Sequence, residues 1–220
     1  MKVNCARKIA LIFLISAYGI QTYSQNIQLP EHNNGRRHRG FFLSWAGGAY
    51  HANIDMEDNN GYSIVKGIGG VMDFKIGGTL VENLILHATW LNHGIFEPKV
   101  YNENGGLAWV EANNIELSEV MIGGGITYYT PINFLLSTSI GYGGFSWSND
   151  TNNEGGSSEG GFCLQIKAGK EWWVSRKLAL GLAAYYHKTI VHNNPSSDID
   201  EKLNSNNFGI LLNLTLNGRK

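Results

Sequence analysis

Residues 169–186 read GKEWWVSRKLALGLAAYY, and this stretch carries the pattern that decides the fold. After the short polar segment 175–177, apolar side chains occupy every second position, beginning with Leu178, Leu180 and Leu182. Alternation of this kind separates an apolar face from a mixed face, which is typical of a β-strand and not of a helix. The stretch therefore predicts two strands joined by a tight turn, with two adjacent tryptophans just before the turn.

The alternating pattern recurs along the chain. It predicts eight strands, at residues 40–51, 64–80, 84–95, 115–129, 134–147, 161–174, 178–191 and 207–216. Three connections are short, at 81–83, 130–133 and 175–177, whereas four are long and polar, at 52–63, 96–114, 148–160 and 192–206. Long and short connections alternate, so all the long ones lie at one end. This predicts an all-β fold, an eight-stranded antiparallel up-and-down transmembrane β-barrel with four external loops.

Composition agrees with a turn-rich β protein. The 220 residues include 28 Gly and only 4 Pro, and aromatic residues make up 11% of the chain. No apolar run reaches the ~20 residues that a membrane-spanning helix needs, whereas the predicted strands suit the ~9–11 residues of a tilted spanning strand. A chain of this kind would cross a bilayer with strands.

The first residues have the features of a secretory signal peptide. Lys2, Arg7 and Lys8 precede the apolar run 9–17, and Ser24 is a plausible cleavage point. An uncleaved anchor helix is the alternative, although its apolar run would be short. We therefore expect a signal peptide at 1–24, a flexible N-terminal segment at 25–39 and a barrel domain at 40–217.

Removal of the leader changes the charge and the cysteine content. It leaves 14 basic against 18 acidic side chains, a formal charge of −4, and Cys163 as the single cysteine. One cysteine cannot form an internal disulfide, so stability must come from strand pairing and packing. A mildly acidic chain also argues against nucleic acid as a partner.

The side of the strands opposite the apolar stripe collects polar and charged residues. A charge that faces lipid at the bilayer midplane would cost ~2–4 kcal/mol, so these side chains are expected inside, where they must pair. Three interpretations stay open: a structural plug of salt bridges, which we favour, a narrow conduit for water or ions, and a catalytic carboxylate site. The predicted lumen network consists of Asp73, Lys75, His87, Glu119, Gln165, Lys167 and Glu171.

The adjacent Trp172 and Trp173 end the sixth predicted strand at its short turn. Tryptophan gathers at membrane–water boundaries, so the pair predicts a periplasmic aromatic girdle. Strand alternation directs Trp172 towards lipid and Trp173 towards the mouth of the lumen. Lys170 then lies on the lipid side, where its stem would have to reach the nearby interface.

The sequence predicts no catalytic, cofactor or metal site. His87 and His93 share a strand face but lie most of a strand apart, and none of the seven histidines has zinc-ligand spacing. Ser146, Ser148 and His187, together with His192, are candidates for a rim Ser–His pair, but polar loops bring such residues together by chance. We therefore predict that the chain is not an enzyme and needs no cofactor.

The chain resembles the small eight-stranded outer-membrane proteins of the OmpA/OmpX-like family. The resemblance covers about residues 40–217 and is carried most strongly by GVMDFKIGGTLVENLILH at 70–87 and GKEWWV at 169–174. It implies location in the outer membrane of a Gram-negative bacterium, contact with outer-membrane lipid and lipopolysaccharide, and a monomer.

What such a barrel does is less constrained by the residues. The leading hypothesis is a structural or surface-interaction role, with a polar plugged lumen and external loops that would contact any extracellular ligand. The alternatives are a lipid-modifying outer-membrane enzyme and a soluble lipocalin-like binder of a small ligand. A lipocalin-like binder would need apolar residues inside and polar residues outside.

Overall fold

The computed structural model describes residues 38–58, 61–102, 109–111, 115–149, 151, 154–196 and 199–218. The expected signal peptide at 1–24 lies outside the described residues, as does most of the segment 25–39. Within the described part, no helix is long and apolar enough to span a membrane.

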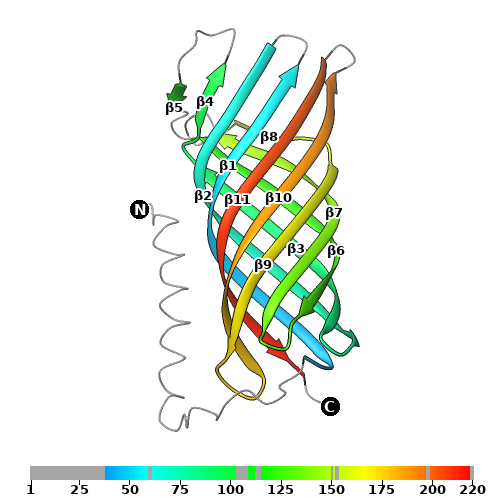
Figure 1. Cartoon of the computed structure of the whole chain (residues 1–220). Coiled ribbons are helices and arrows are strands. Elements are labelled where there is room, and N and C mark those ends of the chain that lie inside the picture. Colours follow the sequence, from blue (N-terminus) through cyan, green and yellow to red (C-terminus); the bar gives the residue numbers. More distant parts are fainter. Residues whose placement is uncertain are drawn as a thin grey trace. The chain divides into compact units, whose positions relative to one another are not determined.

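Eleven strands among the described residues form one antiparallel sheet. Eight of them close into a ring in which β1 pairs with both β2 and β11, so the prediction of an eight-stranded up-and-down barrel is confirmed (Figure 1). In ring order these are β1 (Phe41–Asp58), β2 (Gly61–Val81), β3 (Leu84–Phe96), β6 (Ile115–Tyr129), β7 (Phe134–Asn149), β9 (Gly161–Trp173), β10 (Leu178–Ser196) and β11 (Ile199–Asn217).

The three remaining strands are short and lie outside the ring. β4 (Lys99–Asn102) pairs with β2 and with β5 (Trp109–Glu111), and β8 (Glu154–Ser157) pairs with β7. They fall within two of the predicted long connections, 96–114 and 148–160. These connections therefore contain regular structure of their own.

The other two predicted long loops, 52–63 and 192–206, are mostly strand, which corrects the prediction. β1 continues to Asp58 and pairs with β2 from Gly61, and β10 pairs with β11 in the same way from Ser196 and Ile199. Polar composition had suggested loops there. A polar hairpin that extends into water still pairs its backbone, and the side chains assist: Tyr62 donates a hydrogen bond to Asp55 at 2.8 Å.

The short turns lie at the opposite end of the barrel, as predicted. Asn83 and Asn133 adopt positive φ angles of 65° and 60° in two of them. Asparagine tolerates this left-handed backbone, which a tight strand reversal requires. Backbone hydrogen bonds join these turns to neighbouring strands, since Tyr129 N donates to Asn83 O at 2.9 Å and Glu171 N donates to Asn133 O at 3.0 Å.

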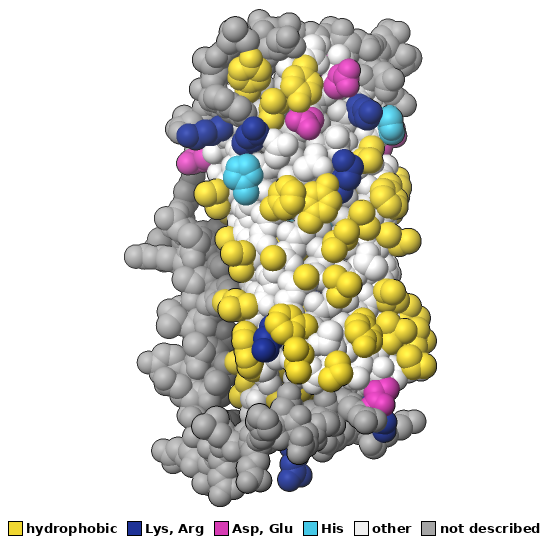
Figure 2. Space-filling model, viewed as in Figure 1, with side chains coloured by type: hydrophobic (Ala, Val, Ile, Leu, Met, Phe, Trp, Pro, Cys, Tyr) yellow, Lys and Arg dark blue, Asp and Glu magenta, His cyan; other side chains and the backbone are white. Residues whose placement is uncertain are grey.

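Side chains alternate between lumen and exterior around the whole ring. Most of the large exposed hydrophobic residues point outward and form a broad band, above which charged side chains gather (Figure 2). The band includes Ile68, Met72, Ile76, Leu86, Ile122, Ile126, Leu136, Ile140, Ile166, Leu182, Ile210 and Leu212. An apolar exterior is the reverse of what the lipocalin-like alternative needs.

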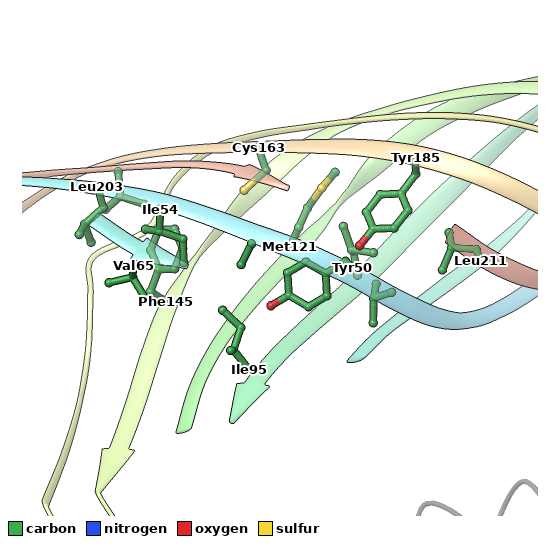
Figure 3. Close-up of a cluster of buried hydrophobic side chains, with 14 of the residues drawn as sticks. Tyr50, Ile54, Val65, Ile95, Met121, Phe145, Cys163, Tyr185, Leu203 and Leu211 are labelled. Carbon is green, nitrogen blue, oxygen red and sulfur yellow. The ribbon is translucent and has the colours of Figure 1, made fainter. Parts of the chain in front are cut away.

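The sequence predicted a polar interior, but the lumen is apolar towards the external end. The largest buried cluster contains Ile54, Val65, Ile95, Phe145, Cys163, Tyr185, Val191 and Leu203 (Figure 3). Glycines make room for the larger rings, because a Cβ on Gly209 would lie 2.5 Å from the Tyr185 ring and 2.8 Å from Tyr50 Cβ. The interior is thus filled by side chains, as in other eight-stranded barrels.

Candidate functional site in the lumen

A buried ion-pair cluster lies in the lumen where β2 faces β9. Lys167 Nζ lies 2.8 Å from Asp73 Oδ2, and Lys75 Nζ lies 3.3 Å from Asp73 Oδ1. Lys75 also donates to Gln165 Oε1 at 2.6 Å and to Ser139 Oγ at 3.0 Å. Each of these side chains is buried, so the hydrogen bonds are needed to offset the loss of water around the charges.

A chain of hydroxyl groups continues from this cluster towards the short turns. His87 makes hydrogen bonds with Thr89 Oγ1 at 3.0 Å and with Thr127 Oγ1 at 2.9 Å, and Thr127 donates to Ser137 at 2.8 Å. The predicted network includes His87 but not the hydroxyl groups. Their strand parity identifies them as inward-facing, so that signal was present in the sequence.

Glu171 lies further along the lumen towards the short turns, and it forms no ion pair among the described residues. Its carboxylate accepts hydrogen bonds from Thr215 at 2.8 Å and from Tyr129 at 3.1 Å. The predicted network is therefore divided, because hydroxyl groups, and not a lysine, hold this carboxylate.

The mouth beside the short turns is filled by His38, which precedes β1. Its ring stacks on Tyr129 at 3.5 Å, and its Nδ1 lies 3.1 Å from Asn217 Oδ1. Its backbone N–H donates to Asn83 Oδ1 at 3.1 Å. Burial lowers the pKa of His38, an effect only partly opposed by the hydrogen bond to Asn217. The end of the expected flexible segment thus packs against the barrel.

Glu119 belongs to a separate group nearer the external end. It accepts hydrogen bonds from Ser205 at 2.8 Å and from Asn207 at 2.6 Å. His93 Nδ1 and His187 Nδ1 face the same carboxylate, at 3.7 and 3.4 Å. Neither histidine belongs to the predicted network with Glu119.

The paired tryptophans take opposite orientations. Trp172 points outward and is 52% exposed, whereas Trp173 turns inward, with its ring 5.0 Å from that of His38. Lys170 lies between two outward-facing aromatic side chains, with Nζ 4.9 Å from the Phe134 ring centroid and 5.9 Å from that of Trp172. Cation–π contact keeps this lysine beside the rings near the turn.

The external mouth holds a cavity of about 350 Å³. Its walls are mostly apolar, from residues such as Val65, Leu117 and Trp147, and the acidic residues Glu57, Asp58 and Glu201 also line it. Glu201 accepts a hydrogen bond from Asn193 at 2.7 Å. This is the concave surface that a ligand from outside would reach first.

The candidates for a rim Ser–His pair are not brought together. Ser146 and Ser148 are exposed on β7, whereas His187 is buried in the lumen and His192 is exposed on β10. Among the described residues, this set therefore does not form a nucleophile and base within reach of each other.

A closed ring of eight strands, with an apolar exterior and buried charges inside, defines a small β-barrel of the outer-membrane type. No family model and no curated protein sequence matches the chain. Among solved structures, the chain is similar to Neisserial surface protein A at 11% identity and a TM-score of 0.48, over 80% of this chain and 97% of that chain.

Two further solved structures are similar. Outer membrane protein OprG from Pseudomonas aeruginosa has 10% identity and a TM-score of 0.49, over 84% of this chain and 100% of that chain. Ail, the attachment invasion locus protein of Yersinia pestis, has 12% identity and a TM-score of 0.41, over 80% and 99%. These likenesses concern the fold alone, and the class assigned here rests on the chain's own strand pairing.

Proposed function

We propose that the chain is a monomeric, non-enzymatic protein of the Gram-negative outer membrane, with a plugged lumen and an external end that contacts surface ligands. In this proposal residues 1–24 are the signal peptide, 25–39 the N-terminal segment and 40–217 the barrel. Outer-membrane lipid and lipopolysaccharide surround the apolar band. A closed ring supports a monomer because it leaves no long unpaired strand edge.

The observation that carries the plugged lumen is the Asp73–Lys75–Lys167 cluster. Its members come from strands on different sides of the ring and meet at 2.8 and 3.3 Å. Buried apolar side chains fill the lumen on the external side of this cluster, and His38 fills the opposite mouth. Together these layers support a structural interior in preference to a conduit.

Two measurements test membrane insertion and closure. The folded chain should be recovered with outer membranes and should migrate differently on a detergent gel before and after boiling. In planar bilayers it should give no steady ion conductance. Recovery of the chain only in the soluble fraction would contradict the membrane assignment, and stable single-channel steps would contradict the plug.

The surface role is supported by the cavity at the external mouth. Apolar walls that also carry carboxylates favour a ligand with an apolar body and a cationic group. A short-chain alkyltrimethylammonium salt is a suitable probe, with binding followed by Trp147 fluorescence. We expect saturable binding that Leu117→Gln and Glu201→Gln weaken, and no effect from Ser146→Ala on the outer surface.

A lack of saturable binding by the folded protein would argue against this ligand chemistry. The enzyme alternative has its own test, which compares lipid A species from cells with and without the protein. We expect identical species. A modified lipid A that depends on expression would contradict the non-enzymatic proposal.

A further inference from the structure

Three buried side chains from different strands converge in the external half of the lumen. His93 on β3 is the direct cross-strand partner of Glu119 on β6, and His187 reaches them from β10. One ligand atom of each lies within 4.8 Å of the others. Two imidazoles and a carboxylate form a donor set that suits divalent transition metals.

We propose that His93, Glu119 and His187 form a binding site for a divalent transition-metal ion of the Zn²⁺ type. Ligand bonds of about 2.0–2.2 Å in tetrahedral geometry place neighbouring donor atoms roughly 3.4 Å apart. The two His Nδ1 atoms lie 3.4 and 3.7 Å from the carboxylate oxygens of Glu119. Since the three donor atoms lie within 4.8 Å of one another, an ion between them would draw the widest pair together by at most about 1.4 Å.

Unsatisfied polar atoms point to the same site. His93 Nδ1 and both ring nitrogens of His187 are buried and have no hydrogen-bond partner in the part of the chain that the structure describes, and both histidines are 0% exposed. Buried polar atoms are normally hydrogen-bonded, so this concentration at one point needs an explanation. A metal ion supplies the missing partner for the Nδ1 atoms of both rings.

The charges of the lumen also favour a cation here. Both buried lysines make their ion pairs with Asp73, at the other cluster. Among the described residues, the cationic or ligating groups that face Glu119 are the two histidines. A divalent ion would neutralise this buried carboxylate directly.

Surrounding residues hold the ligands in suitable orientations. Ser205 donates a hydrogen bond to Glu119 Oε1, and Asn207 donates one to Oε2. Each carboxylate oxygen therefore keeps a further lone pair for the ion. His93 Nε2 lies 2.9 Å from Tyr185 Oη. When this nitrogen carries the proton and donates it to Tyr185, the Nδ1 lone pair faces Glu119, as a metal ligand requires.

Access to the site determines how it must be loaded. Towards the external mouth, Ile95 is buried one inward-facing position beyond His93 on β3, and Val191 is buried two such positions beyond His187 on β10. Leu203 is buried one inward-facing position beyond Ser205 on β11. These apolar side chains lie between the site and the mouth cavity. We therefore expect metal to enter while the barrel forms and to exchange slowly afterwards.

The test begins with refolding of the full chain from urea into detergent micelles with ZnCl₂, followed by removal of free metal with a chelator and desalting. Bound zinc is measured by mass spectrometry in the folded, heat-modifiable fraction only. We expect about one Zn²⁺ per folded chain. Loading with Co²⁺ should give the intense visible absorption of a tetrahedral site. This cobalt measurement uses the wild-type chain alone and needs no variant.

Variants separate the site from adventitious binding. His93→Gln with His187→Gln should reduce bound zinc to background, whereas His87→Gln, another buried lumen histidine, should leave it unchanged. Tyr185→Phe should weaken zinc binding by about 10–100-fold. The proposal is overturned if the folded wild type holds no more zinc than the folded double variant, or if cobalt shows only the weak spectrum of an octahedral, hydrated ion.

Discussion

Lys167 Nζ lies 2.8 Å from Asp73 Oδ2, although the two residues are 94 positions apart in the chain. The contact joins β9 to β2 through the interior and does not follow any pairing of adjacent strands. It ties two parts of the wall that backbone hydrogen bonds do not connect.

Asp73→Asn should destabilise the barrel strongly, because it leaves two buried lysines without their carboxylate. Loss of one partner of a buried pair typically costs about 3–5 kcal/mol. Urea unfolding in detergent, followed by tryptophan fluorescence, measures the free energy of unfolding. Lys167→Met in the Asp73→Asn background should cost less than the sum of the two single changes, since it removes a charge that is already unpaired. Additive effects would contradict direct coupling.

Trp172 and Trp173 should respond differently to lipid. Trp172 is 52% exposed on the outer face, whereas Trp173 packs against His38 in the mouth. In liposomes with brominated lipid, Trp172→Phe should remove part of the quenched fluorescence. Trp173→Phe is the matched control and should leave the quenched part intact. Equal effects of the two changes would show that the outward and inward assignments are wrong.

Packing of His38 should weaken on acidification. Burial lowers its pKa below the ordinary value of 6.5, so the undocked segment binds the proton more readily than the docked one. The docked form is therefore fully stable above pH 6.5 and loses stability as the pH falls below that value. The His38 amide donates to Asn83, and its hydrogen-exchange rate is divided by the intrinsic rate at each pH. This corrected rate should rise as the pH falls from 7.5 to 5.5.

His38→Gln is the control for this pH effect, because glutamine does not titrate in the range. The corrected exchange rate in this variant should not depend on pH. A wild-type segment whose corrected rate also stays constant would contradict the assignment to His38.

Gly209→Ala should destabilise the barrel because the lumen has no space for the added methyl group. A Cβ there would lie 2.5 Å from the Tyr185 ring and 2.6 Å from the Ala49 carbonyl oxygen. Overpacking of this kind typically costs about 1–3 kcal/mol. Gly70→Ala is the matched control, since a Cβ at Gly70 meets nothing within 4 Å. The midpoint of urea unfolding should fall for the first variant and stay unchanged for the second.

The wall of the barrel was predictable from local pattern. Alternation around Leu178–Leu182 requires only that successive side chains of a strand point to opposite faces, and this rule operates over a few residues. The same parity indicated that Asp73, Lys75 and Lys167 face inward. Polarity was a poorer guide to where strands end, because β1 and β10 continue as paired polar hairpins beyond the apolar band.

By itself, the sequence determined the eight strands, their order and the face on which each side chain lies, since all three follow from alternation and from short turns. Only the tertiary structure decided which inward-facing residues meet. Ring closure and strand tilt set the height along the barrel at which each inward-facing side chain lies, and no local spacing in the sequence encodes them. This is why Glu119 lies with His93 and His187 instead of with the lysines, and why Glu171 is held by hydroxyl groups.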